Sequence, residues 1–231
     1  MTFIFPPQAP AAALVAGTQD RFAVHRIYCV GRNYAAHARE MGFSDREPPF
    51  FFGKPADAVV PVAAGQTLEL SYPGATENFH YEGELVVAIG KGGADIAAER
   101  ALDHVWGYAV GLDMTRRDLQ AQMRDTGRPW EVAKAFDHSA PLAPIHPAAQ
   151  VGHFNHGSIW LTVNGQPKQK SDVADMIWSV PEIVAHLSRY FRLEPGDLIY
   201  TGKPEGVGPV KPGDVIRASV DRLGELAVKI V

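Results

Sequence analysis

The stretch that decides the fold is Phe79-His-Tyr-Glu-Gly-Glu-Leu-Val-Val-Ala-Ile-Gly90. Side chains alternate faces along a strand, so this run predicts a strand with Glu82 and Glu84 on one face. The other face carries four apolar residues suited to a core: Tyr81, Leu85, Val87 and Ile89. Two carboxylates that point the same way repel each other unless a positive charge lies between them. The run therefore indicates either a half-exposed strand with two solvated glutamates or an acidic site.

A third carboxylate comes at the end of a second apolar run. Residues 105–112 read Val-Trp-Gly-Tyr-Ala-Val-Gly-Leu, a buried strand by pattern, and Asp113 follows directly. Asp113 can supply a third oxygen ligand beside the two glutamates. Three carboxylates without histidine or cysteine favour a hard cation such as Mg2+ or Mn2+ over zinc.

Composition indicates a globular protein built around one large domain. The chain has 231 residues, of which 46% are hydrophobic and 21% charged, and its net charge is −4. There is no basic stripe for nucleic acid, and no apolar run approaches the about 20 residues of a membrane span. The first residues do not form the basic segment of a signal peptide. Because Cys29 is the only cysteine, we expect no internal disulfide, a packed thiol and a cytoplasmic location.

Strand patterns outnumber helical ones and do not alternate with them regularly. Residues 1–25 are rich in alanine and proline and predict an N-terminal arm or short hairpin, ahead of a catalytic domain at 26–231. Strand patterns in that domain cover 26–30, 50–52, 67–90, 105–113, 159–163, 198–200, 215–220 and 226–230. This arrangement argues against a doubly wound sheet and predicts a mainly β (α+β) fold with a few covering helices.

Helical patterns cover four short segments: 34–41, 94–103, 116–124 and 181–191. Asn33 is the expected N-cap of the first, and Gly42 its C-terminal stop. Thr115 is expected to cap the third helix, with Asp118 completing a pair that resembles a capping box. Asn164-Gly, between two strand patterns, predicts a β-hairpin.

Further side chains suggest chemistry around an acidic site. His37 and Glu40 share a face of the first expected helix, where the carboxylate can orient the imidazole to activate a water, although such pairs are common on helix surfaces. Lys134 lies between apolar neighbours, either as a snorkelling surface residue or as a partly desolvated site cation. Arg117 follows Asp113 by four residues and either clamps a substrate carboxylate or lies on a solvated helix face.

A glycine-rich turn follows the strand pattern at 198–200. It reads Thr201-Gly-Lys-Pro-Glu-Gly-Val-Gly208, and its backbone N–H groups could face an anion. Because it has neither the Walker spacing nor G-x-G-x-x-G, we exclude a nucleotide site there.

Six segments, in order, resemble the motifs of the fumarylacetoacetate hydrolase superfamily, from about residue 28 to the C-terminus. They are Gly31-Arg-Asn-Tyr-Ala-Ala-His37, Phe52-Gly-Lys-Pro55, His80-Tyr-Glu-Gly-Glu84, Leu112-Asp-Met-Thr-Arg-Arg-Asp118, Ala133-Lys134 and the turn at 201–208. The resemblance implies a mixed β-roll and β-sandwich, a homodimer, and a divalent metal, Mg2+ or Mn2+, on Glu82, Glu84 and Asp113. It also implies that His37 and Glu40 activate water and that Lys134 is in the active site. The residues that match substrate-side positions are Lys54, Arg117, Gln120 and Thr201.

The activity implied by the resemblance is cleavage of a carbon–carbon bond in a 3-acylpyruvate. Residues 27–42 favour fumarylpyruvate as the small-molecule substrate, giving fumarate and pyruvate in gentisate-type aromatic catabolism. Its second carboxylate calls for a cation, for which the candidates are Arg116, Arg117 and Lys203. Lys203 stands where relatives commonly have threonine, and it either adds positive charge near this end of the substrate or faces solvent.

Two other functional hypotheses fit the same residues. Oxaloacetate decarboxylation and dienedioate isomerisation use the same metal–enolate chemistry, but they attack no carbonyl with water. The presence of both His37 and Glu40 therefore favours hydrolysis. The third possibility is a metal-stabilised β domain that binds 2-oxo acids without turnover.

Overall fold

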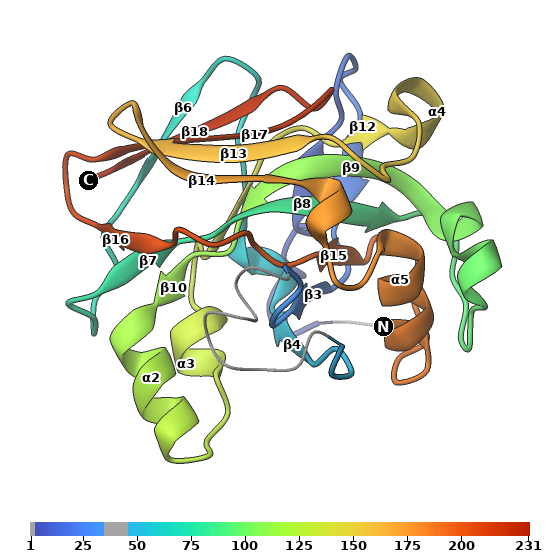
Figure 1. Ribbon diagram of the computed structural model, residues 1–231, viewed down its shortest axis with the longest axis horizontal. Coiled ribbons are helices and arrows are strands. Elements are labelled where there is room, and N and C mark those ends of the chain that lie inside the picture. Colours follow the sequence, from blue (N-terminus) through green and yellow to red (C-terminus); the bar gives the residue numbers. More distant parts are fainter. Residues whose placement is uncertain (1–2, 35–45) are drawn as a thin grey trace.

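The computed structural model describes residues 3–34 and 46–231, and strands dominate it (Figure 1). The largest sheet has eight strands in the order β4-β3-β15-β8-β9-β11-β5, with β12 also paired to β9. Their bounds are β3 (Ile27–Val30), β4 (Phe51–Lys54), β5 (Val59–Pro61), β8 (Gly83–Ile89), β9 (Val105–Leu112), β11 (Ala140–Leu142), β12 (His146–Pro147) and β15 (Leu198–Tyr200). This sheet mixes parallel pairs, such as β15 with β3, and antiparallel pairs, such as β8 with β9.

A second, five-stranded sheet lies over the first, in the order β14-β13-β17-β18-β6 (Figure 1). Its strands are β6 (Thr67–Leu70), β13 (Ser158–Val163), β14 (Gln166–Asp172), β17 (Val215–Val220) and β18 (Glu225–Ile230). The turn between β13 and β14 confirms the hairpin predicted at Asn164, whose backbone φ of 52° is the left-handed conformation that such turns use.

Two small sheets complete the strand pairing. The first is an antiparallel pair made of β1 (Ala12–Leu14) and β2 (Arg21–Ala23). The second has the order β10-β7-β16 and consists of β7 (Phe79–Tyr81), β10 (Thr115–Arg116) and β16 (Gly208–Val210).

The described helices are short and lie mainly at the periphery (Figure 1). The α-helices are α2 (Arg117–Asp125), α3 (Glu131–Lys134), α4 (Ala148–Val151) and α5 (Val180–Ser188), and the 3-10 helices are η1 (Ala56–Ala58), η2 (Ala98–His104) and η3 (Val173–Asp175). The predicted mainly β fold with a few covering helices is therefore confirmed. Within the residues described, no helix is long and apolar enough to cross a membrane.

Strands β8 and β9 separate two apolar cores, because their alternating side chains face both ways. Leu85, Val87 and Ile89 pack against the five-stranded sheet in the larger core. Val86 and Ala88 face the inside of the eight-stranded sheet, with Cys29, Tyr200 and the hairpin residue Ala13 in the smaller core. Glu84 is two residues before Val86 on β8, so its side chain lies on the same face of the strand. The carboxylate thus points toward the side of the sheet that holds the smaller core.

Two local expectations need correction. The pattern at 94–103 forms the 3-10 helix η2 at Ala98–His104 rather than an α-helix from residue 94. Thr115 belongs to β10 and donates its hydroxyl to the Asp113 carbonyl, so it does not cap α2. The Asp118 carboxylate accepts a hydrogen bond from the Leu119 N–H in the first turn of α2, and it also accepts from Thr76 Oγ1 and the backbone N–H of Glu77. The Asp118 carboxylate therefore bonds to a distant segment of the chain, and the predicted capping pair with Thr115 does not form.

Candidate metal centre

Three buried carboxylates meet where the paired strands β8 and β9 end. Glu82 precedes β8, Glu84 lies on it opposite Gly111 of β9, and Asp113 follows β9 directly. The backbone N–H of Asp113 donates to the Glu82 carbonyl at 2.9 Å, which fixes the two chain segments side by side. One oxygen from each carboxylate lies within 4.8 Å of the others, and the three residues are 1–2% exposed.

Two buried lysines compensate this negative charge. Lys134, on α3, places Nζ 2.7 Å from Glu82 Oε2 and 2.8 Å from Asp113 Oδ2. Lys54, on β4, places Nζ 2.9 Å from Asp113 Oδ1 and also donates to the Lys134 carbonyl. Burying ions is expensive unless they are paired and hydrogen-bonded, so this cluster is held together by mutual contacts.

Burial and neighbouring charges shift the pKa values of Glu84, Glu82 and Lys134 in different directions. Burial raises the pKa of Glu84 well above its usual range, and the Asp113 and Glu82 carboxylates add to the effect. Burial acts on Glu82 in the same direction, but nearby cations, first Lys134, hold the pKa of Glu82 well below its usual value. Burial acts to lower the pKa of Lys134, yet Asp113 and Glu82 hold it above its ordinary value. Positive charge delivered beside Glu84 would therefore be stabilised.

This donor set fits a hard divalent cation. The triad offers only carboxylate oxygens, the ligands preferred by Mg2+ and Mn2+. Within residues 3–34 and 46–231, it is also the only cluster of three or more potential acidic, histidine or cysteine ligands. A bound cation would offset the free-energy cost of keeping a charged Glu84 carboxylate buried. The residues present therefore suit such a metal.

A small cavity opens onto the carboxylates. The neutral residues of its lining are Val30, Gly31, Phe52, Gln120 and Trp130, and the charged ones are Arg32, Glu82, Glu84, Asp113, Arg117, Arg124, Lys134 and Lys203. Arg117 Nη1 lies 3.3 Å from Glu82 Oε1 and donates to Gln120 Oε1 at 2.8 Å. Lys203 is 6% exposed, and its Nζ is 3.8 Å from Glu82 Oε1. Cations thus surround the triad on the cavity side.

The structure brings together most of the predicted residues, but not all of them line the cavity. Lys134, Arg117, Gln120 and Lys203 do, with the three metal-ligand candidates. Lys54 supports Asp113 as described above and does not contribute to the lining. Thr201 is turned inward, where its hydroxyl donates to the Leu85 carbonyl at 2.9 Å. Arg116 donates to the Val132 carbonyl, and its guanidinium lies 4.4 Å from the centre of the Phe136 ring.

His37 and Glu40 lie outside the described residues, as does most of the helix expected at 34–41. Their proposed role in activating water stays a prediction. The N-cap role expected of Asn33 also stays a prediction, because the helix lies outside the described residues. The Asn33 side chain donates to the carbonyls of Trp178 and Thr201 and accepts from the Trp178 N–H. This links the motif at 31–37 to the turn that begins at Thr201.

Six lining residues were not predicted as site residues from the sequence: Val30, Gly31, Arg32, Phe52, Arg124 and Trp130. Arg124 had a usable signal, because it follows Arg117 by seven residues and Gln120 by four, a spacing that shares one helix face. Gln169, a fully buried side chain on β14, was also not predicted. Its carbonyl accepts from the Gly83 N–H and its amide donates to the Pro204 carbonyl, both at 2.9 Å. Nothing local marks such a long-range contact.

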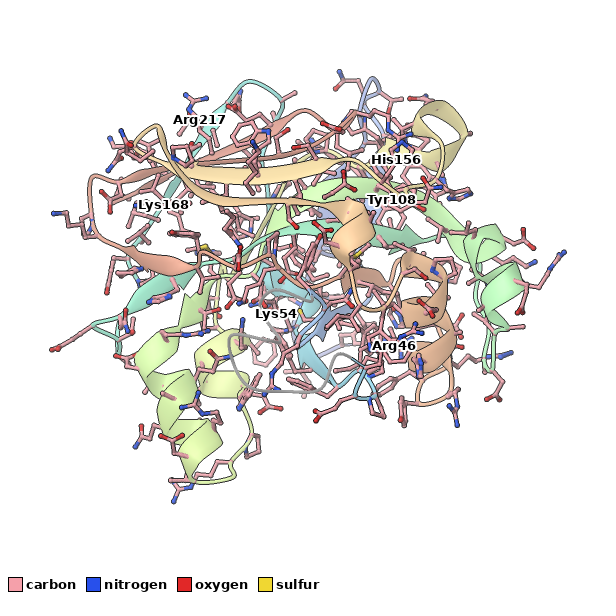
Figure 2. The ribbon with its side chains drawn as sticks, viewed as in Figure 1. Arg46, Lys54, Tyr108, His156, Lys168 and Arg217 are labelled. Atoms are coloured by element: carbon pink, nitrogen blue, oxygen red, sulfur yellow. The ribbon has the colours of Figure 1, made fainter. Side chains whose placement is uncertain are left out.

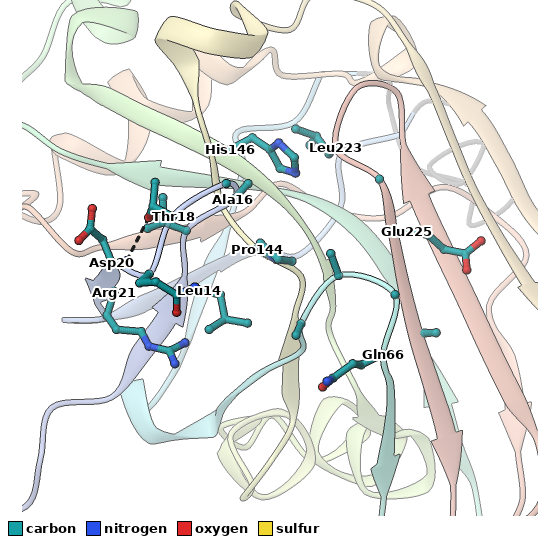
Figure 3. A pocket seen from close by; sticks show the side chains of 18 of the residues that line it. Leu14, Ala16, Thr18, Asp20, Arg21, Gln66, Pro144, His146, Leu223 and Glu225 are labelled. Atoms are coloured by element: carbon teal, nitrogen blue, oxygen red, sulfur yellow. Dashed lines mark hydrogen bonds between the residues drawn. The ribbon is translucent and has the colours of Figure 1, made fainter.

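A second hollow lies beside the β1–β2 pair (Figure 3). This groove has a volume of about 620 Å³ and is lined by residues 14–21, residues 63–67, Pro144, His146, Arg217, Leu223, Gly224, Glu225 and Ala227. In Figure 2, Arg217 of the groove lies over the five-stranded sheet, whereas Lys54, which contacts Asp113 from β4 of the eight-stranded sheet, lies in the lower half of the view. The groove is thus separate from the metal-ligand candidates.

Comparison with known proteins identifies the class of protein. The chain belongs to the fumarylacetoacetate hydrolase family, because residues 26–231 match the family model described as fumarylacetoacetate (FAA) hydrolase C-terminal. The expected family is therefore confirmed.

Individual relatives narrow the class. The crystal structure of fumarylpyruvate hydrolase from Pseudomonas aeruginosa in complex with Mn2+ and pyruvate is 62% identical, with a TM-score of 0.98 over 100% of this chain and 99% of that one. Fumarylpyruvate hydrolase of a Ralstonia species is 47% identical over 80% of this chain and 93% of its own. The mitochondrial oxaloacetate tautomerase of Arabidopsis thaliana is 42% identical over 87% of this chain and 88% of its own.

Proposed function

We propose that the protein is a metal-dependent hydrolase that cleaves fumarylpyruvate into fumarate and pyruvate. The observation that carries this proposal is the buried triad of Glu82, Glu84 and Asp113, surrounded by cations in a chain of this family. The fumarylpyruvate hydrolase crystallised with Mn2+ and pyruvate supports both the metal and the product.

The three carboxylates would hold Mg2+ or Mn2+. When bound there, the metal supplies a Lewis acid that stabilises negative charge developing on the 2-oxo acid end of the substrate. The chain's own cations complete this electrostatic role. Arg117, held by Gln120 and Glu82, presents a guanidinium for the pyruvate carboxylate, and Lys203 adds a second positive charge beside Glu82.

The reaction adds one water across the bond between C3 and C4. The water oxygen bonds to C4, the C3–C4 electron pair leaves with the pyruvate half as an enolate, and a proton then reaches C3. We propose that His37 and Glu40 take the proton of the attacking water, as the family resemblance implies. Lys134 is the proton donor to C3 or the partner of the developing oxyanion, since its Nζ is already fixed beside Glu82 and Asp113.

The test is a spectrophotometric assay of metal-loaded protein on fumarylpyruvate, acetylpyruvate and oxaloacetate, with products separated by chromatography. We expect fumarate and pyruvate from fumarylpyruvate, formed much faster than any product from the other two. Loss of ultraviolet absorbance without those products would contradict hydrolysis. A His37→Ala variant with full activity would refute the water-activating role.

A second candidate is chemistry on oxaloacetate. It is supported by the oxaloacetate tautomerase relative and by a Dictyostelium discoideum oxaloacetate decarboxylase that is 41% identical over 86% of this chain. The same assay separates the two functions. Carbon dioxide released from oxaloacetate, with fumarylpyruvate left intact, would establish the lyase and reject the hydrolase.

We extend the proposal to the setting of the enzyme. The reaction would belong to gentisate-type aromatic catabolism in the cytoplasm, where the single buried thiol of Cys29 would stay reduced. A homodimer is inferred from the resemblance, and the division into an N-terminal arm or hairpin at 1–25 and a catalytic domain at 26–231 is inferred from composition and the extent of the family motifs. Sedimentation of the purified protein would test the dimer.

A further inference from the structure

We propose that Arg124 and Arg32 form a second anion subsite at the outer end of the cavity, which holds the carboxylate on the acyl side of the substrate. The inference rests on the proposed function and names the residues that select a dicarboxylic acylpyruvate. Of the candidates from the sequence, Arg116 faces Phe136 outside the cavity lining, whereas Arg117 and Lys203 contact Glu82 of the triad.

Cations outnumber carboxylates in the cavity lining. The cavity lining contains three carboxylates and five cations. Three of the cations contact the carboxylates: Lys134 at 2.7 Å, Arg117 at 3.3 Å and Lys203 at 3.8 Å from Glu82 oxygens. Arg124 and Arg32 have contacts away from the triad, with the Asp125 carboxylate and with the face of the Phe50 ring. The positive charge of the cavity lining therefore extends beyond the three cations that contact the triad.

The lining residues of α2 are spaced along the length of the helix. Arg117, Gln120 and Arg124 all line the cavity from one face of this helix. Arg117 marks the triad end, and Arg124 is about 10 Å further along the axis at a rise of about 1.5 Å per residue. The two carboxylate carbons of extended fumarylpyruvate are roughly 7.5 Å apart, from its carbon–carbon bonds of about 1.5 Å. A flexible arginine side chain can cover the remaining distance.

Arg32 reaches the cavity lining from the segment that follows β3. Gly31 precedes it, and a Cβ there would lie 1.9 Å from the Phe50 ring, so only glycine allows this ring to pack against the backbone. Arg32 places its guanidinium carbon 5.7 Å from the centre of the same ring. The Phe50 ring in turn packs edge-on against Trp130. Aromatic packing thus holds the backbone beside Arg32 in place.

Two aromatic side chains form part of the cavity surface. Phe52 and Trp130 line the cavity, and their ring centres are 5.8 Å apart. The fumaryl group is flat and conjugated, and an aromatic wall offers it apolar contact. A carboxylate beyond this wall would meet arginine, whose planar fork can give two parallel hydrogen bonds.

The experiment compares Arg124→Gln and Arg32→Gln with Arg128→Gln, an exposed arginine in the segment after α2 that lies outside the cavity lining. Each variant is assayed on fumarylpyruvate and on acetylpyruvate, which lacks the second carboxylate. We expect each cavity variant to lose about 30-fold in kcat/KM on fumarylpyruvate, mainly through KM, which is about 2 kcal/mol at about 1.4 kcal/mol per tenfold. The loss on acetylpyruvate should be at least tenfold smaller, and Arg128→Gln should retain the wild-type ratio.

Two further readouts separate binding from structure. Inhibition by fumarate should weaken in Arg124→Gln and partly recover in Arg124→Lys, since lysine keeps the charge without the fork. Thermal unfolding of Arg124→Gln should match the wild type, because its side chain is 54% exposed. The subsite would be overturned if both cavity variants kept the wild-type preference for fumarylpyruvate, whether activity on the two substrates fell equally or not at all. The hydrolase proposal would then remain intact. Wild-type protein that cleaves neither acylpyruvate would overturn both.

Discussion

The two hollows of this protein differ in size and in chemistry, and the smaller one carries the functional evidence. The groove beside the β1–β2 pair is the more spacious, yet much of its lining is aliphatic and its charged residues lie at the surface (Figure 3). Its Arg217–Glu225 pair, for example, is half exposed. The cavity at the metal-ligand candidates is narrow, but Glu82, Glu84, Asp113 and Lys134 are all at most 2% exposed.

The difference shows that charge held in the interior is a better guide to function than open volume. Surface ion pairs are worth about 0–1 kcal/mol and arise without selection for a role. A buried charge imposes a desolvation penalty of several kcal/mol, so a cluster of them persists only where contacts or a ligand offset it. The variants below test this contrast, from the largest expected effect to the smallest.

The largest effect is expected from removing a metal-ligand candidate. Asp113→Asn should lower kcat on fumarylpyruvate by about 1,000-fold or more, because a Lewis acid contributes several kcal/mol to such reactions. Titration calorimetry with Mn2+ should show loss of the tight site. The matched groove variant, Glu225→Gln, should keep wild-type activity and Mn2+ affinity. Equal behaviour of the two variants would remove the distinction between the hollows.

Removing the buried counter-ion should destabilise the metal-free protein. Lys134→Met leaves Glu82 and Asp113 without their closest shared cation, and losing one partner of a buried ion cluster typically costs about 3–5 kcal/mol. Urea unfolding with chelator present measures this loss, and saturating Mn2+ should recover part of it. The exposed Lys168→Met serves as control. A metal-independent loss would show that Lys134 acts through packing alone.

A smaller effect is expected at Gln169, which we regard as a positioning residue. Gln169→Leu leaves the Gly83 N–H and the Pro204 carbonyl unsatisfied, at about 1–3 kcal/mol in unfolding free energy for such buried groups. Because Gly83 joins the two glutamates, Mn2+ affinity should fall as well. Gln169→Glu keeps the acceptor for Gly83 and should restore more affinity than stability. Lys170→Gln, the exposed neighbour, should change neither quantity.

The smallest effect concerns pH. Burial, with help from Arg117, lowers the pKa of His80 from 6.5 to about 4. The unfolded chain therefore binds more protons between these values, so stability is complete above about pH 6.5 and declines as the pH falls toward 4. Because the ring is partly exposed, we expect about 1 kcal/mol across this window in chelator. His80→Gln should flatten the slope, whereas the exposed His156→Gln should leave it unchanged.

Much of this molecule could be predicted from the sequence because its signals are local. Alternation in residues 79–90 and the apolar run before Asp113 indicated two strands, and the carboxylates on them indicated an acidic site. Six ordered motifs identified the family, which the match over residues 26–231 confirms. The Asn164 turn and the mainly β architecture were likewise correctly predicted.

The rest depends on contacts between distant segments. Thr115 does not form the cap that the local pattern predicted, because it pairs with His80 in the small sheet and its hydroxyl donates to the Asp113 carbonyl. Gln169 supports the site from the second sheet, which no local pattern reveals. Lys54 and Thr201 were predicted on the substrate side, and the structure shows both side chains bonded inside the protein. Their roles toward substrate, like those of His37 and Glu40, stay predictions.

The most direct test of the account is to crystallise the protein with Mn2+ and pyruvate and record anomalous scattering at the manganese edge. We predict one strong peak between the carboxylates of Glu82, Glu84 and Asp113, with pyruvate beside it in the small cavity. A peak in the groove at His146 and Glu225, or none at the triad under saturating Mn2+, would contradict the claim that the buried carboxylates form the metal centre.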